Sequence, residues 1–452
     1  MPAIADVLGE FAARTTLRDV PDEVLDRARH LALDSVGVAH AAVDQEFARR
    51  ARQAAAALGP GDQPVIGLPD RLAPREAALL NAVLVHGLDF DDTHLPAITH
   101  VSATALPVSI AAAIQHGRSA EDLLLAYVLG IEITARIGTV AHGGFHSAGF
   151  HPTALAGAFG SAVSAAKLTG LDGAGIAEAQ RIVGSMASGL LEFLTDGAWT
   201  KRLHPGWAAT GALTAATFAS VGWPGPKEVY EGRYGLYATH LRDAEWNAEE
   251  ALEGLGERWE LLSTAVKPYP SCHFTHGFAD AILELKRAEG FRADEVERIR
   301  CLIHPTPAHA VCEPLERKRT PQDDYDAKFS LPFIAGACVA RDRLTLSEFT
   351  DEALADAEIL RLAQLVEIAD DPESRFPQAY SAEVEIELTG GRHLRRREDV
   401  NRGHTERPLT EADIRAKFTD NLGENAQGTM RHVLSLGTGG SAADFAEALR
   451  AD

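Results

Sequence analysis

Cysteine is scarce in this sequence of 452 residues, which contains four cysteines and no CxxC pair. Spacings of this kind match neither a zinc or iron–sulfur signature nor the disulfide framework of a small secreted domain. Long hydrophobic runs are missing as well, since even residues 123–131 fall well short of the ~20 residues needed to span a bilayer. The N-terminal segment has no basic region followed by an apolar stretch. We therefore expect a cytoplasmic protein with no signal peptide and no membrane partner.

Positive charge is also in short supply, with 65 acidic against 43 basic residues and a formal net charge of -22. Because phosphate binding needs a basic face, we exclude nucleic acid as a partner. Most of the basic residues are arginine, so each lysine that stands beside other polar residues is a candidate functional group. The hydrophobic fraction of 46% and the charged fraction of 24% are typical of a globular protein with a sizeable core.

Most of the first 250 residues have the apolar spacing of amphipathic helices. The pattern predicts helices over residues 21–42, 74–88, 107–115, 120–137, 153–168, 173–189 and 206–221, with Asp19 as the N-cap of the first. Small side chains, concentrated in residues 154–166, allow helices to approach closely. This combination predicts a tightly packed helical bundle.

A different pattern begins near residue 258. It predicts strands over residues 259–266, 296–303, 382–388 and 393–397, and helices over residues 274–287 and 326–340. The last two strands flank Gly390-Gly391, which is a hairpin signal. Helical spacing returns in residues 410–449. We therefore predict a mainly α protein, with a large all-helical bundle domain (residues 1–257 with 401–452) and a smaller α+β lid domain (residues 258–400).

Four polar clusters interrupt the helices. The first, HGLDFDDTH with a following Thr-His, occupies residues 86–100; the second, GGFHSAGFHPT, occupies residues 143–153. The third and fourth are TKRLHPG at residues 200–206 and KPYPSCHFTH at residues 267–276. Helix N-termini favour anions, so a histidine or lysine beside one suits a carboxylate ligand. Taken singly, each cluster is also explained by a capped helix end or a solvated loop.

Together with DAKFSLPF at residues 326–333, these segments resemble the MmgE/PrpD family in both order and approximate spacing. This family includes 2-methylcitrate dehydratases, cis-aconitate decarboxylases and iminodisuccinate epimerase. The resemblance covers residues 5–440, nearly the whole chain. It implies a homodimer in which the helical domain and the lid enclose the active site, with neither a metal nor an organic cofactor.

The resemblance also assigns residues to the site by motif position. By motif position it places Asp89, Thr93, His100, His151, Lys201 and Lys267 in the pocket. We expect catalytic roles for Asp89, His100, His151, Lys201 and Lys267, and substrate binding by Thr93, Arg202, Cys272 and His273. Two positions depart from the family pattern. Some members have a histidine where this chain has Cys272, and several have a tyrosine where it has Phe333, so a phenolic acid expected at that position is missing.

The chemistry of small di- and tricarboxylates suits these residue types. Reactions of this family can begin by making or quenching a carbanion beside a carboxylate, and fixed cations such as Lys201 and Lys267 stabilise that charge. His100 and His151 titrate near neutral pH and can move the proton. Asp89 can orient a histidine, and Thr93 can hydrogen-bond the substrate.

The sequence therefore predicts a cofactor-independent lyase for a small polycarboxylate. Dehydration of 2-methylcitrate or a similar hydroxy acid is the first candidate reaction. Decarboxylation of cis-aconitate and epimerisation of an iminodicarboxylate such as iminodisuccinate are the alternatives.

Two hypotheses from other classes stay open. Asp89, Asp91 and Asp92 at a helix end resemble an aspartate-rich magnesium site, although no second acidic helix with matching spacing is present and an aromatic content of 6% is low for a hydrocarbon pocket. A non-catalytic helical binding protein is the other hypothesis. It would leave His151, Lys201 and Lys267 without a shared purpose.

Overall fold

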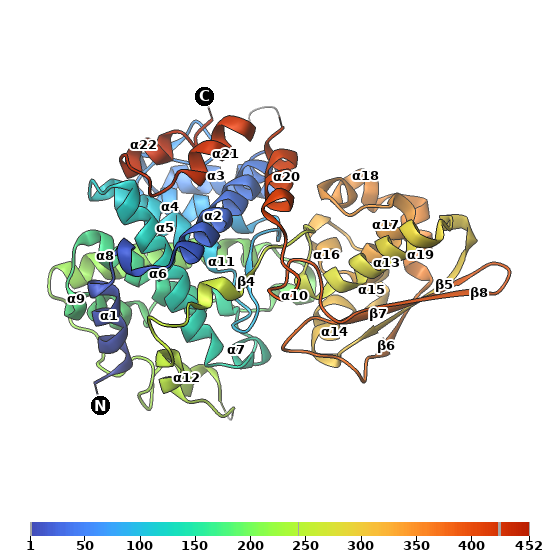
Figure 1. Cartoon of the computed structure of the whole chain (residues 1–452), viewed down its shortest axis with the longest axis horizontal. Helices are drawn as coiled ribbons and strands as arrows, with labels where there is room; N and C mark the ends of the chain where they lie inside the picture. Colours follow the sequence, from blue (N-terminus) through green and yellow to red (C-terminus); the bar gives the residue numbers. More distant parts are fainter. Residues whose placement is uncertain (1, 243, 424–425, 452) are drawn as a thin grey trace.

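The computed structural model describes residues 2–451 except 243, 424 and 425, and it contains two bodies that lie side by side (Figure 1). The larger body is helical and consists of α1 (Ile4–Arg14), α2 (Asp22–Ala42), α3 (Glu46–Leu58), α4 (Pro74–His86), α5 (Val101–Gln115), α6 (Ala120–Thr139), α7 (Gly144–Ser147), α8 (Pro152–Thr169), α9 (Gly173–Val183), α10 (Phe193–Asp196), α11 (Thr200–Ser220), α12 (Leu236–His240), α20 (Glu411–Leu422), α21 (Ala426–Leu434) and α22 (Ala442–Glu447). Two short strand pairs accompany these helices: β1 (Pro60–Pro64) with β2 (Arg71–Leu72), and β3 (Thr93–His94) with β4 (Thr264–Ala265).

The smaller body combines helices with a four-stranded sheet. Its elements are α13 (His276–Glu289), β5 (Val296–Ile303), α14 (Pro305–Val311), α15 (Leu315–Arg319), α16 (Asp324–Lys328), α17 (Leu331–Arg341), α18 (Asp351–Leu354), α19 (Ala357–Gln364), β6 (Val366–Asp370), β7 (Ala382–Leu388) and β8 (Arg392–Glu398). The chain then returns to the first body, where α20 lies at the junction and α21 and α22 pack beside α2 and α5 (Figure 1). The prediction of a mainly α protein with a smaller α+β part is confirmed.

Small side chains let the central helices of the larger body pack backbone to backbone. Helix α8 lies among α5, α6 and α11, and its residues are almost all buried. A Cβ atom added at Gly160 of α8 would collide with the carbonyl oxygen of Gly130 in α6. The alanine-rich and glycine-rich composition of this helix is therefore a packing requirement.

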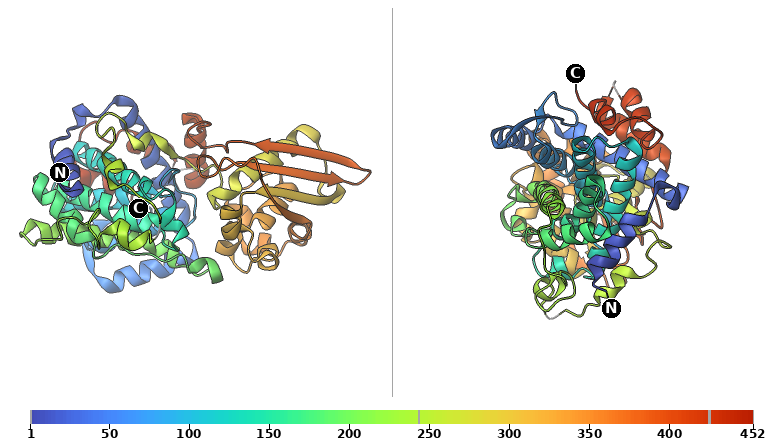
Figure 2. Two further views of the ribbon diagram at one scale, coloured as in Figure 1. Left: turned by 90° about the horizontal axis from the view of Figure 1, so that it is seen from below. Right: turned by 90° about the vertical axis from the view of Figure 1, so that its left-hand side faces the viewer.

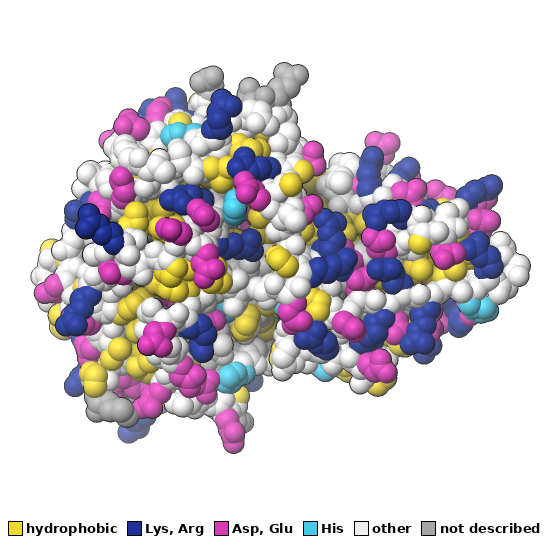
Figure 3. All heavy atoms as spheres, in the orientation of Figure 1, with side chains coloured by type: hydrophobic (Ala, Val, Ile, Leu, Met, Phe, Trp, Pro, Cys, Tyr) yellow, Lys and Arg dark blue, Asp and Glu magenta, His cyan; other side chains and the backbone are white. Residues whose placement is uncertain are grey.

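The sheet of the smaller body has the strand order β6-β5-β7-β8, with β5 parallel to β6 and antiparallel to β7. Gly390 and Gly391 in the β7–β8 turn both have positive φ, as a tight hairpin turn requires. Helices α13 and α17 pack on one side, and Figure 2 shows the strands against the helices of this body. The other side is polar, with ion pairs such as Arg300 to Glu385 at 3.1 Å, and Figure 3 shows mixed basic and acidic side chains over this body.

The buried apolar side chains form two hydrophobic clusters. One draws on residues 4–266 and 409–449, and the other lies chiefly within residues 265–388, joined by Leu95 and Phe193. The domain boundaries at residues 258 and 400 stay a prediction. No helix of the described residues is long and apolar enough to cross a membrane.

Four predictions of local structure are wrong. Residues 326–340 form the end of α16 and most of α17 instead of one helix, because Ser330 caps α17 and the helix is interrupted between Lys328 and Leu331. Residues 259–266 form a 3-10 turn (Glu260–Ser263) and the two-residue β4 in place of a long strand, because the Leu261 N–H donates to the buried Glu132 carboxylate instead of to a neighbouring strand. Asp19 does not cap α2; its carboxylate accepts hydrogen bonds from Thr16 in the preceding turn. Helix α9 ends at Val183, six residues before the predicted end at 189, and a turn follows it.

Helix α11 begins at Thr200 and continues through Pro205, whereas the sequence predicts a start at residue 206. A proline costs the helix one backbone hydrogen bond, and here the buried inner face of α11 compensates for it. Lys201 and Arg202 consequently lie in the first turn of a helix instead of in a loop. This placement decides where each of the two side chains points.

Candidate active site

A small cavity of about 60 Å³ lies between the two bodies. The polar side chains that line it are Asp89, Thr93, His100, His146, His151, Lys201, Lys267, Cys272, His273 and Tyr380. Its apolar lining consists of Ile98, Pro152, Leu191, Phe193, Leu194, Phe274, Ala310 and Phe329. Segments far apart in sequence therefore contribute to one site.

The first polar cluster reaches the cavity because the chain turns sharply after α4. Asp89 has a φ of 54°, in the left-handed region that aspartate tolerates better than most residues. Strand β3 then pairs with β4, which places Thr93 opposite Ala265 and close to the segment that carries Lys267. Backbone hydrogen bonds between His94 and Thr99 turn the chain back, so that His100 also faces the cavity.

Asp89 is the electrostatic centre of the site. Its buried carboxylate lies against the ammonium group of Lys201 on one side and 3.2 Å from that of Lys267 on the other. Burial alone would raise the pKa of Asp89, but Lys201 and Lys267 outweigh it and hold that pKa well below the usual range. The carboxylate is therefore ionised, and it fixes both ammonium groups beside the cavity.

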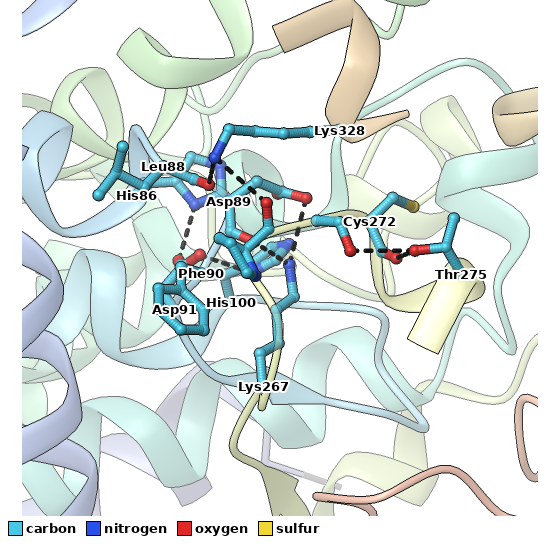
Figure 4. A network of polar contacts seen from close by, with 12 residues as sticks. His86, Leu88, Asp89, Phe90, Asp91, His100, Lys267, Cys272, Thr275 and Lys328 are labelled. Atoms are coloured by element: carbon cyan, nitrogen blue, oxygen red, sulfur yellow. Dashed lines mark hydrogen bonds and ion pairs between the residues drawn. The ribbon is translucent and has the colours of Figure 1, made fainter. Parts of the chain in front are cut away.

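Three lysines hold the backbone around Asp89. The carbonyl oxygens of Leu88, Asp89 and Phe90 accept hydrogen bonds from Lys328 at 2.8 Å, Lys267 at 2.8 Å and Lys417 at 2.7 Å, respectively. Figure 4 shows Lys328 and Lys267 reaching this loop from opposite sides. Burial lowers the pKa of Lys328 to about 7. We call Lys267, Lys328 and Lys417 the lysine cradle.

A second carboxylate, Asp91, joins two histidines behind the cavity. The Nδ1 atom of His86 lies 2.7 Å from one Asp91 oxygen, and Nδ1 of His100 lies 3.3 Å from the other (Figure 4). His100 and His86 overcome the effect of burial and keep the pKa of Asp91 below its usual range. Burial lowers the pKa of His100 to about 4, so its imidazole is neutral at pH 7. The nearby Asp91 carboxylate favours the tautomer with the proton on Nδ1, which makes the Nε2 lone pair of His100 available as a base.

His151 forms the third polar element of the site. It stands at the N-terminus of α8, and its Nδ1 atom lies 3.0 Å from Nδ1 of His204 in α11. Burial, together with the nearby His204 and Lys201, keeps the pKa of His151 well below its usual value. His151 is therefore also neutral at rest.

The wall opposite Asp89 comes from the smaller body and holds both Cys272 and His273. Burial raises the pKa of the Cys272 thiol to about 11 and lowers that of His273 well below its usual range. The Nε2 atom of His273 faces the Asn401 amide nitrogen at 2.9 Å. The buried Tyr380 hydroxyl has no hydrogen-bond partner among the residues that the structure describes. Burial raises its pKa above the usual range, so it keeps its proton.

The structure brings together all but one of the site residues assigned from the sequence. Asp89, Thr93, His100, His151, Lys201, Lys267, Cys272 and His273 all line the cavity. Arg202 does not, and its assignment to substrate binding is wrong. One helical position after Lys201, its guanidinium points away, pairs with Asp324 at 2.8 Å and stacks over Tyr325 at 4.1 Å.

Two further expectations change with the structure. Phe333 is fully buried in the cluster of the smaller body, 6.4 Å from Phe349 in ring-centre distance, and does not line the cavity. The aspartate-rich magnesium site is contradicted, because the three carboxylates diverge. Asp89 faces lysines and Asp91 faces histidines, whereas Asp92 accepts a hydrogen bond from the Ser102 N–H at 3.2 Å.

Several residues that line or adjoin the cavity are not predicted from the sequence as site residues. His86 and His204 belong to the first and third polar clusters, but the sequence does not show that His86 pairs with Asp91 and His204 with His151. His146 likewise belongs to the second cluster. Tyr380 comes from a segment without any motif, and no sequence signal points to it.

Within the described residues, His86, His100 and His151 could together hold a metal ion, since one ligand atom from each lies within 4.8 Å of the others. Asp91 and His204 engage their Nδ1 atoms, which leaves the Nε2 atoms to coordinate. A carboxylate behind a histidine ligand is the usual second layer of a zinc site. The trio is therefore chemically able to take a divalent transition metal.

Comparison with known proteins gives matches over most of the chain. The family model of the MmgE/PrpD N-terminal domain matches residues 6–249, and that of the MmgE/PrpD C-terminal domain matches residues 269–433. The chain is 30% identical to the cis-aconitate decarboxylase of Mus musculus over 421 residues, covering 88% of this chain and 83% of the relative. It is also 30% identical to the cis-aconitate decarboxylase of Homo sapiens over 417 residues, covering 88% of this chain and 84% of the relative. A cis-aconitate decarboxylase-like protein, oryM, of Aspergillus oryzae is 28% identical over 457 residues, covering 95% of this chain and 93% of the relative.

Proposed function

Because this chain belongs to the MmgE/PrpD family, we propose that it is a lyase that acts on a small di- or tricarboxylate without a cofactor. The observation that carries the proposal is the position of Asp89. Its carboxylate holds Lys201 and Lys267 beside a cavity that the neutral imidazoles of His100 and His151 also face. Fixed ammonium groups and two neutral bases are what carbanion chemistry next to a carboxylate needs.

The lysines act on the intermediate. When a carbanion forms beside a substrate carboxylate, its charge spreads into that carboxylate, which then carries close to two negative charges. Lys201 and Lys267 are held in place before the reaction, so little reorganisation is needed to stabilise this charge. The substrate carboxylate would share the two ammonium groups with Asp89.

Decarboxylation is the first candidate reaction, because the relatives described above are named cis-aconitate decarboxylases. The bond between carbon and the departing carboxylate breaks, CO₂ leaves, and the electron pair stays on carbon, delocalised toward a second carboxylate. One proton then adds to carbon. His151 can deliver it from Nε2 if its Nδ1 atom takes the Nδ1 proton of His204 while the Nε2 atom of the half-buried His204 accepts a proton from solvent.

Dehydration is the second candidate, as for 2-methylcitrate or a similar hydroxy acid, and the neutral state of His100 favours it. An imidazole with a pKa of about 4, backed by the ionised Asp91, accepts a proton from carbon. Hydroxide then leaves from the adjacent carbon, with a proton supplied by another group on the wall. Epimerisation of an iminodicarboxylate would use the same proton abstraction, followed by return of a proton to the opposite face.

Proton NMR in D₂O separates these reactions. We would incubate the protein with citrate, 2-methylcitrate, cis-aconitate, malate and iminodisuccinate in turn. Loss of a carboxylate means decarboxylation, a new alkene signal from a hydroxy acid means dehydration, and deuterium at the α carbon with inversion means epimerisation. Absence of turnover across the panel and of competition by any of these acids would contradict the proposed function.

The remaining assignments are part of the same proposal. We propose a homodimer and a cytoplasmic location, with a small polycarboxylate as the ligand. The resemblance of the sequence motifs to the MmgE/PrpD family supports the homodimer and the polycarboxylate ligand.

A further inference from the structure

His146 differs from the other histidines that line the cavity. His100, His151 and His273 each have one ring nitrogen within 3.3 Å of another side chain, which orients the ring. Among the residues that the structure describes, neither ring nitrogen of His146 has such a partner, although the residue lines the cavity. Polar groups inside proteins are normally hydrogen-bonded, so a side chain of this kind beside a cavity points to a ligand. Both nitrogens of His146 are therefore available to a bound molecule.

Helix α7 holds His146 at the junction of the two bodies. The preceding Phe145 is 1% exposed and anchors this short helix in the core of the larger body. Gly143 and Gly149, which both have positive φ, turn the chain into and out of the helix. The ring of His146 stands edge-on to that of Phe274, with 6.3 Å between the ring centres, and Figure 1 shows α7 beside the smaller body.

The cavity comes closest to the surface around His146. Most of its lining residues are buried, and the side chains of Asp89 and Lys267 are only 1% exposed. The half-buried lining residues, each within two positions of an exposed residue, are Ile98, His146, Leu191 and Leu194. We call these four residues the mouth. A ligand held by the lysines at Asp89 can extend from the closed part of the cavity toward the mouth.

The imidazole of His146 is suited to binding and not to proton transfer. Burial, and to a smaller extent the charge of Lys201, lower the pKa of His146 to about 4, so the ring is neutral at pH 7. Among the described residues, no carboxylate or second imidazole pairs with it to supply or remove a proton, as happens at His100 and His151. Its proton can sit on either nitrogen, and the ring can donate one hydrogen bond to a substrate oxygen.

The proposed reaction does not use every carboxylate of a tricarboxylate substrate. In decarboxylation one carboxylate departs as CO₂ and a second accepts the charge, and dehydration uses the carboxylate beside the carbanion. Any further carboxylate takes no part in bond breaking, and we call it the remote carboxylate. At the mouth it keeps part of its hydration, so a neutral hydrogen-bond donor is enough to orient it.

We propose that His146 binds the remote carboxylate of the substrate through a hydrogen bond from its neutral imidazole. Lys201 and Lys267 hold the reacting end beside Asp89, and His146 fixes the other end. His146 thereby determines how strongly an additional carboxylate contributes to binding. The inference rests on the proposed function, because it concerns the substrate of that same site.

A pair of ligands combined with a variant tests the proposal. Tricarballylate and methylsuccinate share one skeleton and differ by a single terminal carboxylate. Calorimetric titration of each acid into the wild type and into His146→Phe gives four affinities, and phenylalanine keeps a ring beside Phe274 without either nitrogen. We expect the variant to bind tricarballylate about tenfold more weakly and methylsuccinate within about twofold of the wild type. An equal loss for both acids, which a structural role would produce, would overturn the inference.

Steady-state kinetics give a second measurement, with the acid of the NMR panel that the wild type converts. His146→Phe should raise KM about tenfold and change kcat about threefold or less, because His146 contacts no reacting atom. His146→Gln keeps an N–H donor, so its KM should stay within about threefold of the wild type. A KM in His146→Gln as high as in His146→Phe would show that a neutral donor is not what binds the substrate, and would overturn the inference.

His142→Asn is the matched control. His142 lies in the same segment with 60% of its side chain accessible, and asparagine tolerates its φ of 47°. This variant should bind both acids like the wild type, and a loss equal to that of His146→Phe would contradict the proposal.

The outcomes separate the inference from the proposed function. Unchanged tricarballylate binding in a folded His146→Phe protein would overturn the inference, while turnover of any acid of the panel by the wild type would still support the lyase. Selective loss of tricarballylate binding, without turnover of any acid of the panel, would support the inference and remove the lyase. Binding of neither saturated acid to the wild type would overturn the inference as well.

Discussion

The Nδ1 atoms of His151 and His204 lie 3.0 Å apart, facing each other. Two neutral imidazoles can share such a contact only if one carries its proton on Nδ1 and the other on Nε2. The pair therefore has two arrangements, which differ in whether the Nε2 atom of His151 is protonated. In one arrangement His151 is a proton donor to the cavity, and in the other it is a base.

His151→Ala should reduce kcat at least a hundredfold without unfolding the protein, as expected for the loss of a general acid or base. His204→Phe should reduce kcat about tenfold and leave KM nearly unchanged, because His151 keeps its place but loses its proton partner. Steady-state kinetics with the substrate that the wild-type protein converts will check both. His309→Phe on the exposed side of α14 is the control, and wild-type rates in His151→Ala would remove His151 from the mechanism.

Lys201→Ala should abolish measurable turnover, with a loss of about a hundredfold or more, because one of the two cations that stabilise the intermediate disappears. The far-ultraviolet circular dichroism spectrum should stay the same. Lys227→Ala, at an exposed lysine, should retain full activity. Equal rates in the two variants would contradict the placement of the substrate at Asp89.

The buried histidines predict a dependence of stability on pH. Burial lowers the pKa of His276 to about 3, against about 6.5 for a free histidine. Between these two values the unfolded chain binds a proton that the folded chain does not, so the free energy of unfolding falls as the pH is lowered through this window. Each fully buried histidine of this kind contributes up to about 1.4 kcal/mol per pH unit.

Asp92 has the opposite effect on the free energy of unfolding, because burial raises the pKa of its carboxyl group to about 7. The contribution of a histidine is therefore measured by comparing variants with the wild type. We expect His276→Gln to lose less Tm than the wild type between pH 7 and pH 5, as measured by differential scanning calorimetry. His393→Gln, at an exposed position of β8, should behave like the wild type. The same Tm loss in His276→Gln would show that His276 takes up its proton in the folded state.

The motifs predicted most of the site because they carry charged and imidazole side chains in a fixed order. The direction of Arg202 was not predictable, since it depends on α11 beginning before Pro205, which sets the two neighbouring side chains about 100° apart around the axis. The lysine cradle could not be predicted from the sequence for another reason. Its acceptors are backbone carbonyl groups, which every residue has and which leave no mark in a sequence.

Local patterns succeeded where one physical preference dominates. The β7–β8 hairpin is confirmed because two glycines supply its positive φ angles. The strand predicted over residues 259–266 is wrong because this segment contacts two different elements. Leu261 is bound to α6 through Glu132, and Ala265 pairs with Thr93 in β3. Tertiary contacts of this kind override strand propensity.

If the chain forms the proposed homodimer, we predict that the exposed apolar side chains of α11 form its interface. Leu203, Trp207 and Phe218 lie on one face of this helix and are 47%, 47% and 42% exposed. Exposed apolar side chains that share one helix face form a candidate interaction site. We expect a dimer by light scattering at micromolar concentration, and a shift toward monomer in Trp207→Glu. Leu58→Glu, at a 66% exposed leucine of α3, should stay dimeric, and a monomeric wild type would contradict the proposal.

Chelation should leave the reaction unchanged. Lys201 and Lys267 supply the positive charge, so we expect the same kcat after dialysis against EDTA. Added Zn²⁺ should inhibit reversibly by binding His86, His100 and His151, and His86→Gln should weaken this inhibition. Activity that depends on added Mg²⁺ would contradict the cofactor-free mechanism.

The lysine cradle has a consequence for how the enzyme is made. The Phe90 carbonyl group accepts its hydrogen bond from Lys417, which lies 327 positions later in the chain. The Leu88 carbonyl group accepts one from Lys328, 240 positions later. A ribosome completes the helical motifs around Asp89 long before it has synthesised either lysine. The nascent chain therefore carries the Asp89 carboxylate in an unfinished setting, and we expect the proposed site to be complete only after Lys417 in α20 has been synthesised and has docked.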